Sequence, residues 1–112
     1  MGVLGVFNTR ELEEFATVLA SDLARRFPPA SEERTDPGAK HQIKVILEGL
    51  AARAVRYHEE HKLGIYKKAK LANVFKWKLS ELGYSVDFVD RATKELATRL
   101  ASSKGQPRNA KP

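Results

Sequence analysis

The chain of 112 residues contains no cysteine. This absence excludes a disulfide framework, a thiolate nucleophile and any zinc site built on cysteine ligands. No apolar run approaches the roughly 20 residues that a membrane-spanning helix needs. The opening MGVLGV is too short and lacks the basic start of a secretory signal, and Val6 stands where a myristoylation signal needs Ser or Thr. We therefore expect a soluble, cytoplasmic protein.

Motifs of catalysis and of metal binding are lacking as well. The sequence has no glycine-rich phosphate loop, no Ser/His/Asp pattern and no Glu-x-x-His helices of the di-iron type. Adjacent acids such as Glu13 and Glu14 point about 100° apart on a helix, as solvated surface residues do. His58 and His61 are three residues apart, unlike the zincin pair, and no third ligand is indicated. We expect no enzyme activity, no metal and no cofactor.

Acidic residues are missing from one stretch, residues 62–80, which carries six lysines and the sole tryptophan, Trp77. The segments 1–61, 81–101 and 102–112 carry −2, −1 and +3, so their charges cancel. The net charge of +6 at pH 7 is therefore matched by this one stretch. A basic balance of this kind favours an anionic partner, such as nucleic acid or an acidic protein.

The first helix is predicted over about residues 9–26. Asn8 is its expected cap and Pro28-Pro29 ends it. The polar, proline-bearing stretch 28–36 is typical of a surface loop. One apolar stripe recurs at helical spacing along the helix: Leu12, Phe15, Ala16, Leu19, Leu23 and Phe27.

The second helix is predicted from Pro37, with Asp36 as its cap, to about Lys62. Gly64 is the expected C-terminal stop, because glycine readily adopts the left-handed conformation found there. The apolar stripe of this helix runs on into the two histidines and consists of Ile43, Ile46, Leu47, Leu50, Ala54, Tyr57, His58 and His61.

Two further helices are predicted, over about 65–82 and from Ser85 onward, with Gly83 between them. Their core stripes are Leu71, Ala72, Phe75, Leu79 and Leu82 on the third helix, and Val89, Ala92, Leu96 and Leu100 on the fourth. We predict an all-α fold, a four-helix and mostly antiparallel bundle. It forms a single domain over residues 1–101, followed by a disordered basic tail over 102–112.

One side of the third helix combines lysines with aromatic residues, away from the core stripe. Ammonium groups pair with phosphates and release counterions, while Trp and Tyr rings stack on bases. The first hypothesis is therefore a small basic binding or regulatory module that associates with nucleic acid. Its candidate contacts are Lys67, Lys70, Lys78, Trp77 and Tyr66, assisted by the tail residues Lys104, Arg108 and Lys111.

Two alternatives remain for the same residues. In the first, the third helix buries two faces, as a middle helix of a bundle often does. Trp77 and Tyr66 then pack against a neighbouring helix, and the lysines are only solvated. In the second, Trp77, Tyr66 and Val74 form a surface patch that contacts another protein. The chain is then an interaction or assembly subunit, with a homodimer among the options, and it has no nucleic-acid role. No membrane partner and no small-molecule substrate are predicted.

The corner LSELGYSVDFV, residues 79–89, resembles the turn of a helix-turn-helix DNA-binding motif, with Gly83 in the turn. The spacing G-[FY]-S-x-x-x-V-x-x-A also occurs in ubiquitin-associated domains and other small three-helix modules. Lys78 stands at a position that this motif normally buries, and Asp87 and Asp90 would repel phosphates. We therefore favour a generic helix–helix corner.

Overall fold

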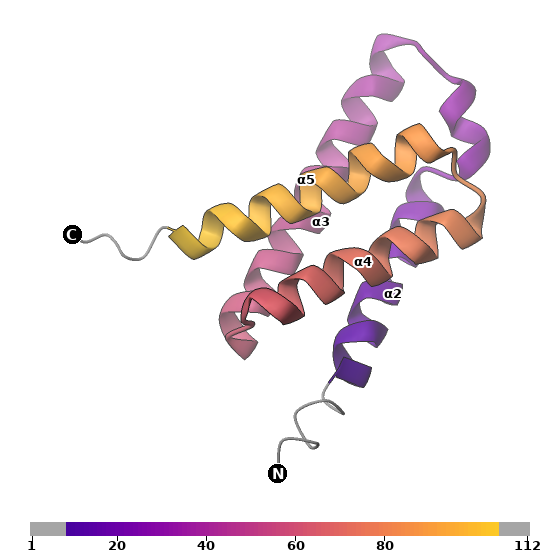
Figure 1. Ribbon diagram of the computed structural model, residues 1–112. Helices are drawn as coiled ribbons and strands as arrows, with labels where there is room; N and C mark the ends of the chain where they lie inside the picture. The colour runs from indigo at the N-terminus through magenta and orange to yellow at the C-terminus, as the bar shows by residue number, and fades with distance from the viewer. Residues whose placement is uncertain (1–8, 106–112) are drawn as a thin grey trace.

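The computed structural model describes residues 9–105, with side chains to residue 102 (Figure 1). Four α-helices and one short 3₁₀ helix follow one another: α2 (Thr9–Arg26), η1 (Pro29–Glu33), α3 (Pro37–His61), α4 (Ile65–Leu82) and α5 (Val86–Gly105). No strand occurs among residues 9–105. The prediction of an all-α, four-helix bundle with antiparallel neighbours is confirmed.

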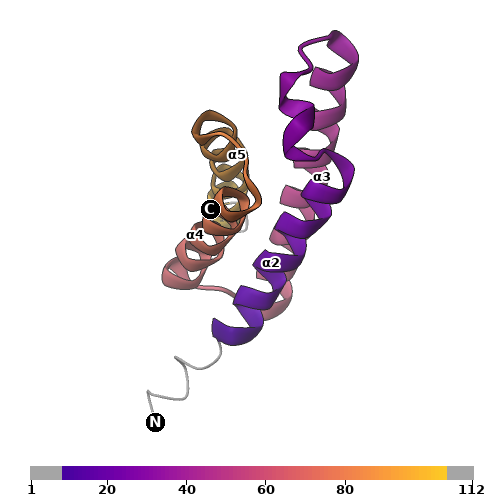
Figure 2. The same ribbon diagram turned by 90° about the vertical axis from the view of Figure 1, so that its right-hand side faces the viewer.

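The helices form two layers that cross each other, α2 with α3 and α4 with α5 (Figure 2). The main packing is between the layers, α2 on α4 and α3 on α5, and between α4 and α5 themselves. α2 and α3 contact each other less. The smallest dimension of the molecule is 19 Å, which corresponds to two helices of about 10 Å each.

The predicted apolar stripes supply the core. All the bulkiest fully buried side chains come from three of these stripes: Phe75, Leu12, Leu19, Leu23, Leu71, Leu79, Leu96 and Leu100. Two residues of the predicted stripes are exposed instead of buried: His61 at the end of α3, and Leu82, which is 42% exposed. Leu82 is the last residue of α4, and Tyr84, two residues later, occupies a buried place at that end of the core.

The caps of α3 and α5 lie where the sequence placed them. The Asp36 carboxylate accepts a hydrogen bond from the Ala39 amide at 3.0 Å, and the Ser85 hydroxyl accepts one from the Phe88 amide at 3.2 Å. Each side chain satisfies a backbone donor that the helix itself leaves unpaired. The predicted cap of α2, Asn8, lies outside the described residues.

The end of α3 differs from the prediction. The left-handed residue is Lys62, with a φ of 52°, and its amide donates to the His58 carbonyl. Leu63 then folds into the core. Gly64 instead precedes the first turn of α4, so burial of Leu63, rather than glycine's freedom, fixes where α3 stops.

Two other boundaries also differ. The stretch predicted as an irregular loop contains η1, whose residue Glu32 reaches Ser85. α5 continues to Gly105, so residues 102–105 are helical rather than part of the predicted tail. The rest of that tail, 106–112, lies outside the described residues.

The α4–α5 corner turns through Gly83, whose φ is 103°. From there α4 and α5 run side by side in opposite directions (Figure 1). The helices of a helix-turn-helix instead meet at about 90–120°. The corner is therefore a helical hairpin. This agrees with the departures of Lys78, Asp87 and Asp90 from the helix-turn-helix motif.

Candidate functional site

The outer side of α4 carries an exposed aromatic ridge. Tyr66 is 69% exposed and Trp77 is 61% exposed. Tyr66, the exposed Asn73 and Trp77 follow one another at the spacing i, i+7, i+11, which places their side chains on one side of the helix. We call these three residues the α4 ridge. The interpretation that Trp77 and Tyr66 pack against a neighbouring helix is wrong, because α2 and α5 cover the other sides of α4.

Two of the three candidate lysines beside the ridge have carboxylate partners. Lys70 Nζ lies 3.5 Å from a carboxylate oxygen of Glu13 on α2, and Lys78 Nζ lies 3.5 Å from one of Glu81. For Lys67, which is half-buried, no hydrogen bond or ion pair is found within residues 9–102. The border of the ridge therefore alternates in charge instead of being uniformly basic.

Two further lysines of the stretch, Lys68 and Lys76, also present less charge to solvent than the sequence suggests. Lys68 is buried, and its ammonium donates to the Leu100 carbonyl at 3.2 Å. Lys76 lies 4.0 Å from Asp90. The side chains of the predicted tail contacts, Lys104, Arg108 and Lys111, lie outside the described part of the chain.

The two histidines near the end of α3, His58 and His61, do not converge. The half-buried His58 lies near Lys68, and its pKa is lowered by burial and by that ammonium charge. His61 is exposed, stacks on Tyr57 with ring centroids 4.0 Å apart, and holds Nδ1 3.0 Å from the Tyr57 carbonyl oxygen. Their environments are those of packed helix residues rather than of a ligand pair.

A buried carboxylate joins α2 to α3. Asp22 accepts hydrogen bonds from Arg25 and from Arg53, the latter at 2.9 Å, and lies 3.4 Å from Arg26. Burial acts to raise the pKa of Asp22, but the three guanidinium groups together lower it. Helical spacing indicates only the local contacts of Asp22 with Arg25 and Arg26, because Arg53 is 31 positions away.

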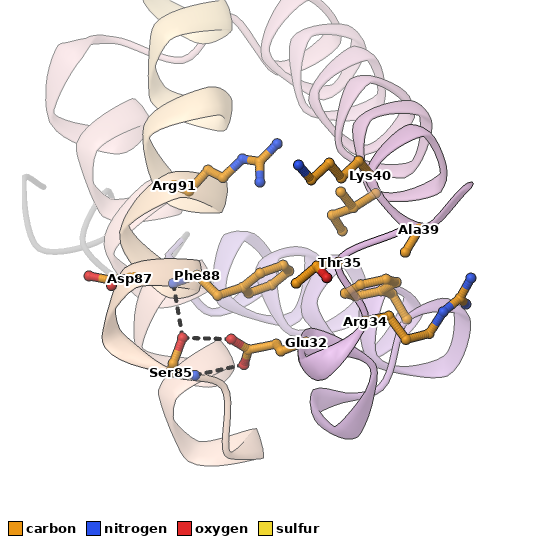
Figure 3. Close-up of a pocket in the computed structure, with 11 residues that line it drawn as sticks. Glu32, Arg34, Thr35, Ala39, Lys40, Ser85, Asp87, Phe88 and Arg91 are labelled. Atoms are coloured by element: carbon orange, nitrogen blue, oxygen red, sulfur yellow. Dashed lines mark hydrogen bonds between the residues drawn. The ribbon is translucent and has the colours of Figure 1, made fainter. Parts of the chain in front are cut away.

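A pocket of about 390 Å³ opens between η1, α3 and α5 (Figure 3). Its apolar lining includes Phe27, Ile43 and Phe88. Three cations also line it: Lys40, Arg91 and Arg34, the last of which is paired with Asp36. The sequence does not indicate this pocket, because its residues are up to 64 positions apart. The only available signal was that a basic residue stands near the start of each of two helices. We call this the α3–α5 pocket.

No protein-family model, curated protein or solved structure matches this chain. None of the helices within residues 9–105 is long and apolar enough to cross a membrane. Over the same residues, no three His, Cys, Asp or Glu side chains gather closely enough to hold a metal ion. We base our proposals on the α4 ridge and the α3–α5 pocket.

Proposed function

We propose that this protein is a small helical binding module that docks another protein on the α4 ridge. The observation that carries the proposal is the exposure of Trp77 and Tyr66 on one side of one helix. Trp and Tyr supply a large share of binding energy at protein interfaces, where burial in a partner's pocket removes their apolar surface from water.

The surroundings of the ridge favour a protein over a polyanion. The pairs Lys70–Glu13 and Lys78–Glu81 place negative charge beside each of these lysines. A phosphate backbone approaching the ridge would meet both carboxylates, whereas a protein tolerates a rim of mixed charge around an apolar centre. Exposed ion pairs contribute only about 0–1 kcal/mol, so they can exchange partners across an interface.

Site-specific photo-crosslinking in cells tests the proposal. The change Asn73→p-benzoylphenylalanine puts the crosslinker in the middle of the ridge, and we expect a discrete adduct that protease removes and nuclease does not. The same crosslinker at Val45, which is 50% exposed on α3, is the matched control. Adding Trp77→Ala should abolish the adduct while leaving the fold intact, because surface substitutions usually change stability by less than about 0.5 kcal/mol.

The other outcomes of the crosslinking experiment lead to different conclusions. An adduct of twice the mass of the chain identifies a second copy as the partner, as an isologous dimer requires. The result that would contradict a docking role for the ridge is an equal yield of adduct with the crosslinker at position 73 and at position 45, with no change in that yield when Trp77→Ala is added.

A second candidate function is sequence-tolerant binding of single-stranded nucleic acid through Lys67, Lys70, Lys78, Trp77 and Tyr66. The observation that favours it is the pair of exposed rings with Lys67 beside them, since bases stack on aromatic side chains. The measurement is the emission of Trp77 at low salt with added polynucleotide. Quenching that salt reverses, and that the triple change of the lysines to Gln abolishes, would support this function. Binding weaker than about 0.1 mM would exclude it.

A further inference from the structure

The α3–α5 pocket has a preformed apolar interior. The rings of Phe27 and Phe88 stack with centroids 5.9 Å apart, and Tyr84 stacks on Phe88 at 4.6 Å. The Tyr84 hydroxyl donates to the Phe27 carbonyl at 2.5 Å, so this aromatic cluster is held between α2 and α5. Ile43 from α3 completes the apolar lining. A rigid apolar interior is what small-molecule sites use for contact area.

Two cationic side chains converge over this interior. Lys40 extends from α3 and Arg91 from α5, and their charged ends point toward one another above the ring of Phe88 (Figure 3). Within residues 9–102, neither side chain has a hydrogen bond or an ion pair. Two like charges facing each other repel, and an oxyanion between them would replace that repulsion with two attractions.

The acidic side chains of the pocket do not neutralise this pair. Glu32 is held at the opposite side, where its two oxygens accept hydrogen bonds from the Ser85 amide at 2.8 Å and the Ser85 hydroxyl at 2.6 Å. Asp87 points away from the pocket (Figure 3). The cationic end and the carboxylate end of the pocket are therefore separate.

We propose that the α3–α5 pocket binds a small organic anion. Its carboxylate or phosphate lies between Lys40 and Arg91, where the planar guanidinium offers two parallel N–H donors. Its apolar ring or chain rests on Phe88 and Ile43. The volume of about 390 Å³ is at the lower end of the range for small-molecule sites, which selects a ligand with one ring or a short chain.

The test is an amide-resolved NMR titration of the full chain with three probes: 3-phenylpropionate, its neutral amide 3-phenylpropanamide, and inorganic phosphate. We expect 3-phenylpropionate to shift the amides of Lys40, Ile43, Phe88 and Arg91 in a saturable way, with a Kd of about 1 mM or tighter. Phosphate lacks the apolar body and the amide lacks the charge, so each should bind at least about tenfold more weakly.

Charge-matched variants separate the pocket from general basicity. The double change Lys40→Gln with Arg91→Gln should weaken 3-phenylpropionate binding by about tenfold or more, because charge-assisted hydrogen bonds are lost. The control is Lys44→Gln with Lys94→Gln, which removes the same charge from exposed positions of the same helices and should change the Kd by less than about twofold.

Three results would overturn the proposal. They are no saturable shift up to about 10 mM 3-phenylpropionate, equal affinity for phosphate alone, or equal loss in the control variant. None of them bears on the α4 ridge, because Lys40 and Arg91 lie on α3 and α5.

Discussion

At the scale of single residues, Tyr84 joins three parts of the molecule. It follows the turn at Gly83 and is buried, and its hydroxyl donates a hydrogen bond to the Phe27 carbonyl just after α2. That carbonyl follows the last turn of α2, before the two prolines. Burial, together with the charge of Glu32, raises the pKa of Tyr84 to about 12. Tyr84 is thus both a packing residue and the donor for a carbonyl away from water.

Removing the hydroxyl with Tyr84→Phe should lower the free energy of unfolding by about 1–3 kcal/mol, because the Phe27 carbonyl is left without this donor. The unfolded chain ionises near pH 10 and the folded protein near 12, so the wild type loses stability as pH rises through this range. Urea unfolding at pH 7 and pH 11 measures both effects. An equally steep loss at pH 11 in Tyr84→Phe would contradict the assignment.

His58 provides a second test at this scale, in acid. Because its pKa is lowered by burial and by Lys68, the unfolded chain takes up the proton first as pH falls below 6.5. The free energy of unfolding should therefore decrease from pH 6.5 downward. The variant His58→Gln should show a shallower decrease, measured by urea unfolding at several pH values. His41→Gln, at an exposed position of α3, serves as the control and should keep the wild-type slope.

At the scale of helices, α3 and α4 each end at a residue in the left-handed conformation. Gly83 holds a φ of 103° at the end of α4, and nothing lies within 4 Å of where a Cβ would stand. Lys62 holds a φ of 52° at the end of α3. The same left-handed helix end is therefore made once by glycine and once by a residue whose Cβ atom is strained in that conformation.

Opposite substitutions at these two stops should have opposite effects. Lys62→Gly should stabilise the protein by about 0.5–1 kcal/mol, since removing the left-handed strain outweighs the entropy of an added glycine. Gly83→Ala should destabilise it by about 1 kcal/mol or more, through backbone strain alone.

Thermal and urea unfolding measure both changes. Lys62→Gln removes the same charge without relieving the strain, and it should leave stability nearly unchanged. If Lys62→Gln stabilised the chain as much as Lys62→Gly, charge rather than conformation would be responsible.

At the scale of the whole molecule, the packing depends on the crossing of two layers. α2 packs mainly on α4 and α3 mainly on α5, and α2 and α3 contact each other less, so the α2–α3 layer does not bury its apolar stripes alone. The Asp22–Arg53 bond joins α2 to α3, but the side chain of Arg53 is 44% exposed. A bond of this exposure adds little to the stability of an isolated pair of helices.

We therefore expect the whole chain to unfold in one cooperative transition and the fragment 1–63 not to fold. Circular dichroism during urea unfolding gives the comparison, with a sharp transition for the full chain and a low, featureless helical signal for the fragment. A cooperative transition in the fragment would show that the first layer is stable without the second.

The sequence by itself determined the helices, because their signals are local. Asp36, Ser85 and Gly83 act within a few residues of their own positions, and the apolar stripes repeat within single helices. Only the tertiary structure decided which basic residues reach solvent. Lys68 and Lys70 are close in sequence, yet one is buried beside Leu100 and the other pairs with Glu13.

The two candidate sites divide in the same way. The α4 ridge follows from the spacing of residues within one helix, and what the structure added was the 61% exposure of Trp77. The α3–α5 pocket could not be read from the sequence, because Lys40 and Arg91 are 51 positions apart and meet only where α5 crosses α3. Periodicity fixes the side of a helix on which a residue lies, whereas its neighbour depends on how the two layers cross.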